Sequence, residues 1–255
     1  MKQASHIDMR WLPGDLFVDN APSKWKDKVP QLIETPEGLK WFAGTQDMSV
    51  PTKDLSLPRL GASRQTPARG STKHLDRMLD AGFYDGRDHP TTPEIRIEDQ
   101  NMDGVDAEVI YGPLIIDPQQ KNTELVHLLH EIYNTWVAGF QATNPERFVP
   151  LACLSNYDGA AAASELRRCA KLGLRGAEID FSSAAKPIWH NDWDQVWEAA
   201  EECEMPISFH ARGIPQQAPH DEKMHDEYIN PVLGVQYTVF QLAGAETVSY
   251  THLRA

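Results

Sequence analysis

The feature that most constrains the fold is a regular alternation of apolar strands and amphipathic helices in the second half of the chain. Predicted strands begin at residues 148, 174 and 206, so successive starts lie 26 and 32 residues apart. This spacing is the length of one strand–helix–strand step, in which right-handed crossovers join parallel strands. The sequence therefore predicts a parallel α/β sheet.

The segments between these strands carry helix signals. Residues 123–141 place a wide apolar stripe on one helical face, as expected for a helix that packs on a sheet. Asp158 is a predicted N-cap, and the helix that it opens ends at Gly173. The helices predicted next to these strands include 92–104, 123–141, 158–173 and one that begins at Asp192.

Strand candidates over the whole chain lie near residues 4–8, 107–111, 148–154, 174–179 and 207–210. No G-x-G-x-x-G motif follows a strand, which favours a (β/α)₈ barrel over a dinucleotide-binding sheet. A barrel of this kind needs roughly 250 residues, but the fifth strand ends only 45 residues before the end of this sequence. We therefore predict an incomplete TIM-like (β/α)₈ barrel of about five strands; an open five-stranded sheet is the alternative.

Residues 13–70 are predicted to form a long, mostly irregular insertion. The segment holds seven prolines, and its apolar residues keep neither the period of a strand nor that of a helix. Trp11, Trp25 and Trp41 favour packing over disorder. Because long loops in compact domains are usually functional, we expect a lid or cover.

Composition excludes several classes of function. The chain has 37 acidic and 24 basic residues, and its net charge of −13 would repel a nucleic-acid backbone. No run approaches the roughly 18 apolar residues of a membrane span, and no signal peptide is visible. Cys153, Cys169 and Cys203 show no C-x-x-C spacing and lie in apolar stretches. We expect a cytoplasmic enzyme with a small-molecule substrate.

His210 is the strongest candidate for the active site. It ends a buried strand, and the carboxyl ends of parallel strands are where α/β enzymes place their active sites. Neutral imidazole is a common metal ligand there; the alternative is a histidine hydrogen-bonded at a strand end. His6 and Asp8 are two apart, so on a strand both could reach one ion. Asp8 could equally begin the following loop.

Other polar residues are weaker candidates. His190 follows a predicted strand closely enough to contact substrate, and Arg212 could bind a substrate carboxylate or be a surface arginine. His127 and His130 are predicted to lie on a partly exposed helix face without a role in the site. Because neither a G-x-S-x-G elbow nor a Walker loop occurs, serine hydrolysis is disfavoured.

Several short motifs, taken in their order and spacing, resemble the amidohydrolase-related family that includes aminocarboxymuconate-semialdehyde decarboxylase. The resemblance covers residues 1 to about 246. The motifs are Ser5-His6-Ile7-Asp8, Trp11-Leu12-Pro13, Asp103-Gly104-Val105-Asp106, Glu146-Arg147-Phe148, Trp197-Glu198-Ala199-Ala200 and Pro206-Ile207-Ser208-Phe209-His210.

The resemblance implies a (β/α)₈ barrel that binds one divalent metal ion, commonly zinc. In the family the ligands are a D/E/H-x-H pair on strand 1, a histidine on strand 5 and an acid after strand 8. His6 matches the second residue of the pair, and His210 matches the strand-5 histidine. Ala4 occupies the first position of the pair and cannot ligate, so either Asp8 substitutes or the site lacks one ligand.

The function implied by the resemblance is chemistry on a small acidic or aromatic molecule. We expect a hydrolase whose metal lowers the pKa of its water to about 7, so that the hydroxide attacks the substrate. A non-oxidative decarboxylase that uses nearly the same site is the alternative, and a non-catalytic fragment is a further one.

The end of the sequence departs from the family pattern. We expect residues 1–246 to be a partial barrel domain and residues 247–255 to be a non-native tail. The strand-8 acid is expected in a longer protein, which could be a homo-oligomer.

Overall fold

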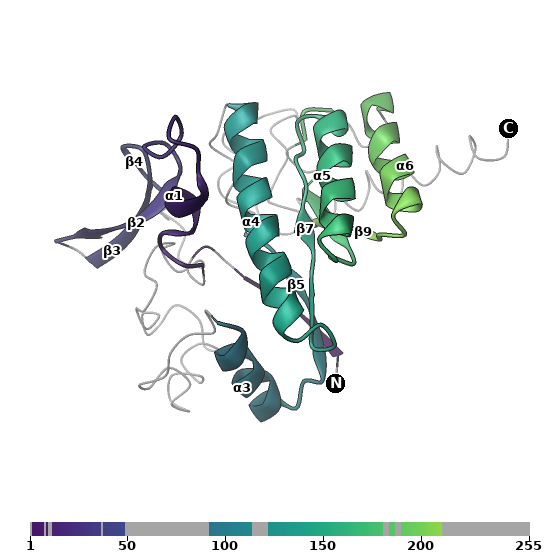
Figure 1. The fold of residues 1–255 in the computed structure, drawn as a ribbon, viewed down its shortest axis with the longest axis horizontal. Helices are drawn as coiled ribbons and strands as arrows, with labels where there is room; N and C mark the ends of the chain where they lie inside the picture. The colour runs from purple at the N-terminus through teal and green to yellow at the C-terminus, as the bar shows by residue number, and fades with distance from the viewer. Residues whose placement is uncertain are drawn as a thin grey trace, which may run out of the picture. The chain divides into compact units, whose positions relative to one another are not determined.

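The computed structural model describes residues 2–7, 9, 12–36, 38–48, 92–113, 122–180, 184–186 and 190–210 (Figure 1). The chain divides into two compact units. The first unit comprises Met1–Ile115 and Thr135–Val149, and the second comprises Ile116–Asn134 and Pro150–Ala255. Each unit contains a three-stranded sheet built from predicted strands, so each is described by itself.

The sheet of the first unit has the order β1-β5-β6. Strand β1 (Lys2–His6) pairs in parallel with β5 (Ala107–Tyr111), and β6 (Phe148–Pro150) lies on the other side of β5. Helix α3 (Pro93–Asp103) precedes β5, as predicted. Its N-cap Thr92 accepts a hydrogen bond from the Ile95 amide, and it ends at Gly104 in the left-handed region with φ 66°.

The expectation that residues 13–70 are mostly irregular is wrong for residues 30–47. Helix α1 (Leu16–Asn20) is followed by an antiparallel sheet of β2 (Pro30–Thr35), β3 (Gly38–Ala43) and β4 (Gln46–Asp47). Two of the prolines do not interrupt this sheet, because Pro30 is the first residue of a strand and Pro36 lies in a turn. The predicted packing is confirmed for Trp25 and Trp41, which are buried; Trp11 and residues 49–70 lie outside the described residues.

The sheet of the second unit has the order β7-β8-β9 and is parallel, which confirms the predicted parallel pairing. The strands are β7 (Ala152–Cys153), β8 (Ala177–Asp180) and β9 (Ile207–His210). The helices between them are α5 (Gly159–Lys171), the short 3₁₀ helix η3 (Asn191–Trp193) and α6 (Asp194–Glu202). The single strand predicted at 148–154 is in fact two strands, β6 and β7, because its two halves pair with different neighbours.

The remaining described helix, α4, spans Thr123–Thr143, close to its predicted bounds, and the boundary between the units crosses it at Asn134. Helix α5 begins at its predicted cap, where the Asp158 carboxylate accepts hydrogen bonds from the amides of Ala160 and Ala161. Among the helices that the structure describes, none combines the length and the apolar character needed to cross a membrane.

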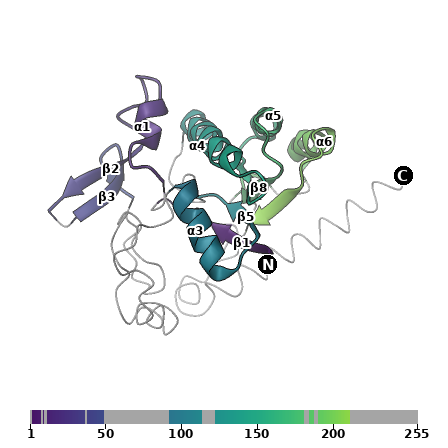
Figure 2. The ribbon, with the colours of Figure 1, turned by 60° about the horizontal axis from the view of Figure 1, so that its bottom comes forward.

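The two faces of the second unit's sheet differ in chemistry. Helices α5 and α6 lie side by side on one face, above β8 and the light-green β9 (Figure 2). Phe209 of β9 points to this face, because its ring meets that of Trp197 on α6 edge-on at 6.2 Å. Since side chains alternate along a strand, Ser208 and His210 lie on the face away from the helices.

Candidate active site at the ends of the parallel strands

The two strands β8 and β9 end side by side. Asp180 and His210 are register partners in the parallel ladder, and each is the last residue of its strand. Register partners share a face and lie on neighbouring strands about 4.8 Å apart. Asp180 is buried and His210 is half-buried. The structure thus places a carboxylate residue beside the histidine that the sequence singled out.

Asp180 was not among the residues predicted for the site. The signal that could have found it is the alternation of Glu178, Ile179 and Asp180 in a strand predicted to be buried. Charged side chains at every second position of a buried strand indicate one face that is not part of the apolar core.

The segment after β7 fixes the end of β8. Asn156 is fully buried, and its side-chain amide donates a hydrogen bond to the Asp180 carbonyl at 2.8 Å. The Leu154 amide donates to the Glu178 carbonyl at 3.0 Å. Deeper in the sheet, the thiol of Cys153 lies 3.4 Å from Oε1 of Glu178, on the face that also carries Asp180. The strand ends of this unit therefore form one edge with a fixed backbone.

In the first unit, His6 lies at the carboxyl end of β1. Its imidazole is exposed and stacks on the Tyr111 ring, with centroids 5.3 Å apart and planes 28° from parallel. The Ile7 amide donates to the Tyr111 carbonyl at 2.8 Å and extends the ladder past His6. Ala4 faces the same way and is exposed. A methyl group therefore stands on the face of β1 where the resemblance to the family implies a ligand.

The opposite face of the same strands carries a buried ion pair. Arg96 of α3 and Glu108 of β5 are each 6% exposed, and the Arg96 Nε donates to Glu108 Oε1. The Arg96 Nη2 also donates to Ser5 Oγ at 2.7 Å and to the His6 carbonyl at 3.4 Å. Ser5 in turn donates to Glu108 Oε2 at 2.7 Å. This network ties β1 to β5 behind the His6 side chain.

The structure gives His190 a local contact. It is exposed and precedes η3, where its Nδ1 accepts a hydrogen bond from the Asp192 amide at 3.2 Å. Its role in binding substrate stays a prediction. Asp8 and Arg212, the other two candidates from sequence, lie outside the described residues.

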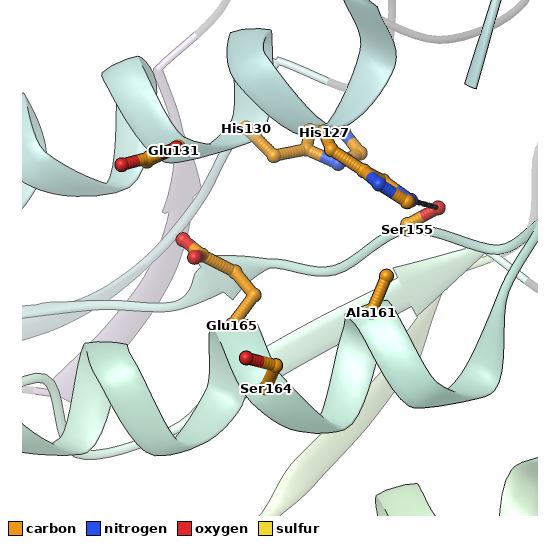
Figure 3. Close-up of a pocket in the computed structure, with 7 residues that line it drawn as sticks. All are labelled: His127, His130, Glu131, Ser155, Ala161, Ser164 and Glu165. Atoms are coloured by element: carbon orange, nitrogen blue, oxygen red, sulfur yellow. Dashed lines mark hydrogen bonds between the residues drawn. The ribbon is translucent and has the colours of Figure 1, made fainter. Parts of the chain in front are cut away.

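A polar cavity of about 200 Å³ lies between α4 and α5 (Figure 3). His127 Nε2 is 3.2 Å from Ser155 Oγ there, and the prediction of a partly exposed face is wrong for His130, which is buried. His130 points into this cavity, across from Ala161, Ser164 and Glu165 of α5. The lining residues are His127, His130, Glu131, Ser155, Ala161, Ser164 and Glu165.

The Glu165 carboxylate on the wall of this cavity is held in a network. Burial alone would raise the pKa of Glu165, but hydrogen bonds from Arg168 and Asn134 outweigh it, and the pKa lies below its usual value. Asn134 also bonds both backbone groups of Cys153, at 3.0 and 2.8 Å. Burial, followed by the neighbouring Glu165 charge, raises the pKa of the Cys169 thiol. Through these contacts Glu165 links Asn134 of α4 to Arg168 of α5.

The donors at the strand ends fit a divalent metal ion in kind. Imidazole nitrogen and carboxylate oxygen are ligands of zinc and of other first-row metals. Within the described ranges, no three His, Cys, Asp or Glu side chains gather closely enough to hold an ion by themselves. The described part of the second unit offers a pair of donor residues, Asp180 and His210, and the first unit offers His6.

Comparison with known proteins gives the family. Residues 51–232, more than half of the chain, match the family model described as amidohydrolase. The chain belongs to the amidohydrolase family. Over 130 residues it is 30% identical to 2-amino-3-carboxymuconate-6-semialdehyde decarboxylase of Dictyostelium discoideum, a match that covers 50% of this chain and 35% of that protein. Over 71 residues it is 38% identical to the decarboxylase orsB of Emericella nidulans, which covers 28% of this chain and 22% of that protein.

A solved structure shows the same fold. The crystal structure of an amidohydrolase from Mycobacterium avium subsp. paratuberculosis matches with a TM-score of 0.60 at 14% identity, over 82% of this chain and 57% of that one. The matched regions thus span 35% of the Dictyostelium decarboxylase and 57% of the mycobacterial protein. These findings confirm the family resemblance that the sequence motifs indicated.

Proposed function

We propose that this protein is a metal-dependent, non-oxidative decarboxylase that acts on a small acidic or aromatic carboxylic acid. The observation that carries the proposal is the pairing of Asp180 with His210 at the carboxyl edge of a parallel sheet. Active sites of α/β enzymes lie at this edge. The choice of decarboxylation is supported by the names of the Dictyostelium and Emericella relatives, each of which is a decarboxylase.

One divalent ion, zinc in the first instance, is proposed to bind at His210; the role of His6 as a metal ligand stays a prediction from the sequence. When bound, such an ion acts as a Lewis acid that polarises substrate oxygens and stabilises the charge that develops as carbon dioxide leaves.

The chain's own residues prepare this chemistry by fixing the donors. Stacking on Tyr111 limits rotation of the His6 imidazole, and the Asn156 amide holds the backbone at the end of β8. Arg212, two residues beyond His210, is proposed to bind the substrate carboxylate. In the reaction the bond between the substrate carbon and its carboxylate breaks, carbon dioxide leaves, and that carbon takes up a proton.

Hydrolysis by an activated water is the second candidate. It is favoured by the description of the matching family model as amidohydrolase. The two reactions differ in what becomes of water, because hydrolysis places a solvent oxygen in the product and decarboxylation places only a solvent proton there.

The test is a panel of small carboxylic acids incubated with the 255-residue protein and Zn²⁺ or Mn²⁺ in H₂¹⁸O. We expect release of carbon dioxide from at least one acid, with no ¹⁸O in the organic product. Product that carries ¹⁸O without release of carbon dioxide would establish the hydrolase. Metal-stripped protein and His210→Ala are the controls, and both are expected to be inactive. Failure of every acid, together with absence of bound metal, would support the non-catalytic fragment.

A further inference from the structure

We propose that Asp180 is a direct ligand of the divalent ion, so that β8 and β9 together supply a carboxylate and an imidazole. The inference rests on the proposed function, because it assigns a further ligand to the same ion. It also accounts for Ala4. Because Ala4 cannot contribute a donor, a carboxylate on a neighbouring strand would replace the ligand that position 4 lacks.

The register of the sheet carries the argument. Asp180 pairs with His210, and the preceding pair on the same face is Glu178 with Ser208. Side chains of register partners project in the same direction from strands about 4.8 Å apart. A carboxylate oxygen and an imidazole nitrogen that start from such positions can converge on one ion with metal–ligand bonds of about 2.0–2.2 Å.

The backbone of this pair is fixed before any ion binds. The Asn156 amide holds the Asp180 carbonyl, and Asn156 is itself fully buried. On the other face, Phe209 meets Trp197 of α6 and anchors β9 next to His210. Donors held in this way lose little conformational freedom on binding, which favours metal affinity.

Burial strengthens the expected interaction. Asp180 is 8% exposed, and charges attract more strongly where little water surrounds them.

Glu178 provides a matched control. It lies on the same strand and the same face as Asp180, and it is 1% exposed. It is also about 6.6 Å farther from the strand end, and its Oε1 contacts the Cys153 thiol. Glu178→Gln removes a buried carboxylate from this face without removing the proposed ligand.

The experiment is a titration of the full chain with Mn²⁺, in which electron paramagnetic resonance measures the free ion. Asp180→Asn keeps the size of the side chain but is a much poorer ligand, and we expect it to raise the dissociation constant at least about 100-fold, above the roughly 10–100-fold range typical of residues that only orient a ligand. His210→Ala is expected to weaken binding at least as much. Glu178→Gln is expected to leave the dissociation constant unchanged within about threefold.

Asp180→Ala allows a second test, a chemical rescue, because a small carboxylate such as formate can enter the space left by the missing side chain. We expect formate to restore Mn²⁺ binding to Asp180→Ala and to have no such effect on His210→Ala. Circular dichroism of each variant is the control for folding.

The outcomes separate the two proposals. If His210→Ala abolishes binding but Asp180→Asn does not weaken it, Asp180 is not a ligand and the proposed function stands. If neither substitution changes the affinity, the metal site at this edge, and with it the proposed function, is wrong. An equal loss in Asp180→Asn and Glu178→Gln would mean that overall charge on this face is responsible, and would overturn the assignment.

Discussion

The sheets β1-β5-β6 and β7-β8-β9 each bury acidic residues, the first on a face that meets a helix and the second on the face away from its helices. Glu108 of β5 is 6% exposed and faces α3, where Arg96 neutralises it. Asp180 of β8 is 8% exposed and faces away from α5 and α6, beside the strand-end His210. An acidic residue that faces a helix thus forms a buried ion pair, whereas Asp180, on the face away from the helices, is the residue that we propose as a metal ligand.

Strand β1 shows the same division within two consecutive residues. Ser5 faces α3 and joins the Arg96 network, whereas His6 points the other way and stacks on Tyr111. Arg96 also donates a hydrogen bond to the His6 carbonyl. The network on the α3 side therefore holds the backbone of His6, whose side chain lies on the opposite face. Alternation along a strand is sufficient to separate the two tasks.

The largest effect is expected from breaking the ion pair on the helix side. Arg96→Met leaves Glu108 buried without its guanidinium, and removal of one partner from a buried pair costs about 3–5 kcal/mol. Urea denaturation would measure this loss. The exposed pair of Arg167 and Glu202 is the control, and Arg167→Met should cost less than about 1 kcal/mol.

The double variant Arg96→Met/Glu108→Leu sharpens this test. If the loss in the single variant comes from the stranded charge, removing both partners should recover most of the stability. A double variant as unstable as the single one would instead show that the hydrogen bonds to Ser5 and His6 are what hold β1.

A smaller loss is expected at Asn134, which serves the helix side of the second unit. Asn134→Ala removes the partners of the Cys153 amide and carbonyl, and buried unsatisfied groups cost about 1–3 kcal/mol each. We expect unfolding at a lower urea concentration, with a total loss of about 2–4 kcal/mol. A change below about 0.5 kcal/mol would show that another group or water takes over these hydrogen bonds.

Glu165 should add a dependence on pH. Its folded-state pKa is below the usual value of 4.5, because hydrogen bonds from Arg168 and Asn134 outweigh the effect of burial. A lowered carboxyl pKa contributes stability that is fully present above the ordinary value and is lost as pH falls through the folded value. Glu165→Gln should therefore flatten the fall in urea midpoint below pH 4.5. An unchanged slope would contradict this assignment.

The smallest effect on stability is expected on the face away from the helices. Asp180→Asn removes a residue assigned to chemistry, so its stability should change by less than about 0.5 kcal/mol or rise slightly, as at functional sites where activity is favoured over stability. The matched comparison is Glu108→Gln, which keeps the size of that side chain. It should lower the free energy of unfolding more than Asp180→Asn does. Equal losses in thermal unfolding would remove the contrast between the two faces.

Sequence signals that act within a few residues predict several helix ends of this chain correctly. Thr92 and Asp158 cap helices as predicted, and Gly104 ends one, because these signals act within a few residues. His210 was found for a similar reason, since the end of an apolar strand is a local pattern. The elements around the candidate site therefore follow from sequence to within a few residues.

Features that depend on pairing between distant segments were missed. Asp180 is a candidate site residue because its register partner is His210, 30 residues away along the chain. No local sequence pattern encodes that register. The break between β6 and β7 at Leu151 reflects a change of partner strand. The antiparallel sheet at residues 30–47 was obscured because the sequence does not show that Pro30 and Pro36 fall at strand ends.

The metal content of the purified protein is the most direct measure of the proposed metal site. After dialysis against metal-free buffer, elemental analysis of the 255-residue chain should find about one tightly held divalent ion per chain, the number expected for a single site. His210→Ala should lose that ion while remaining folded. Wild-type protein that is folded and holds no metal, or a His210→Ala variant that retains a full equivalent, would contradict the account.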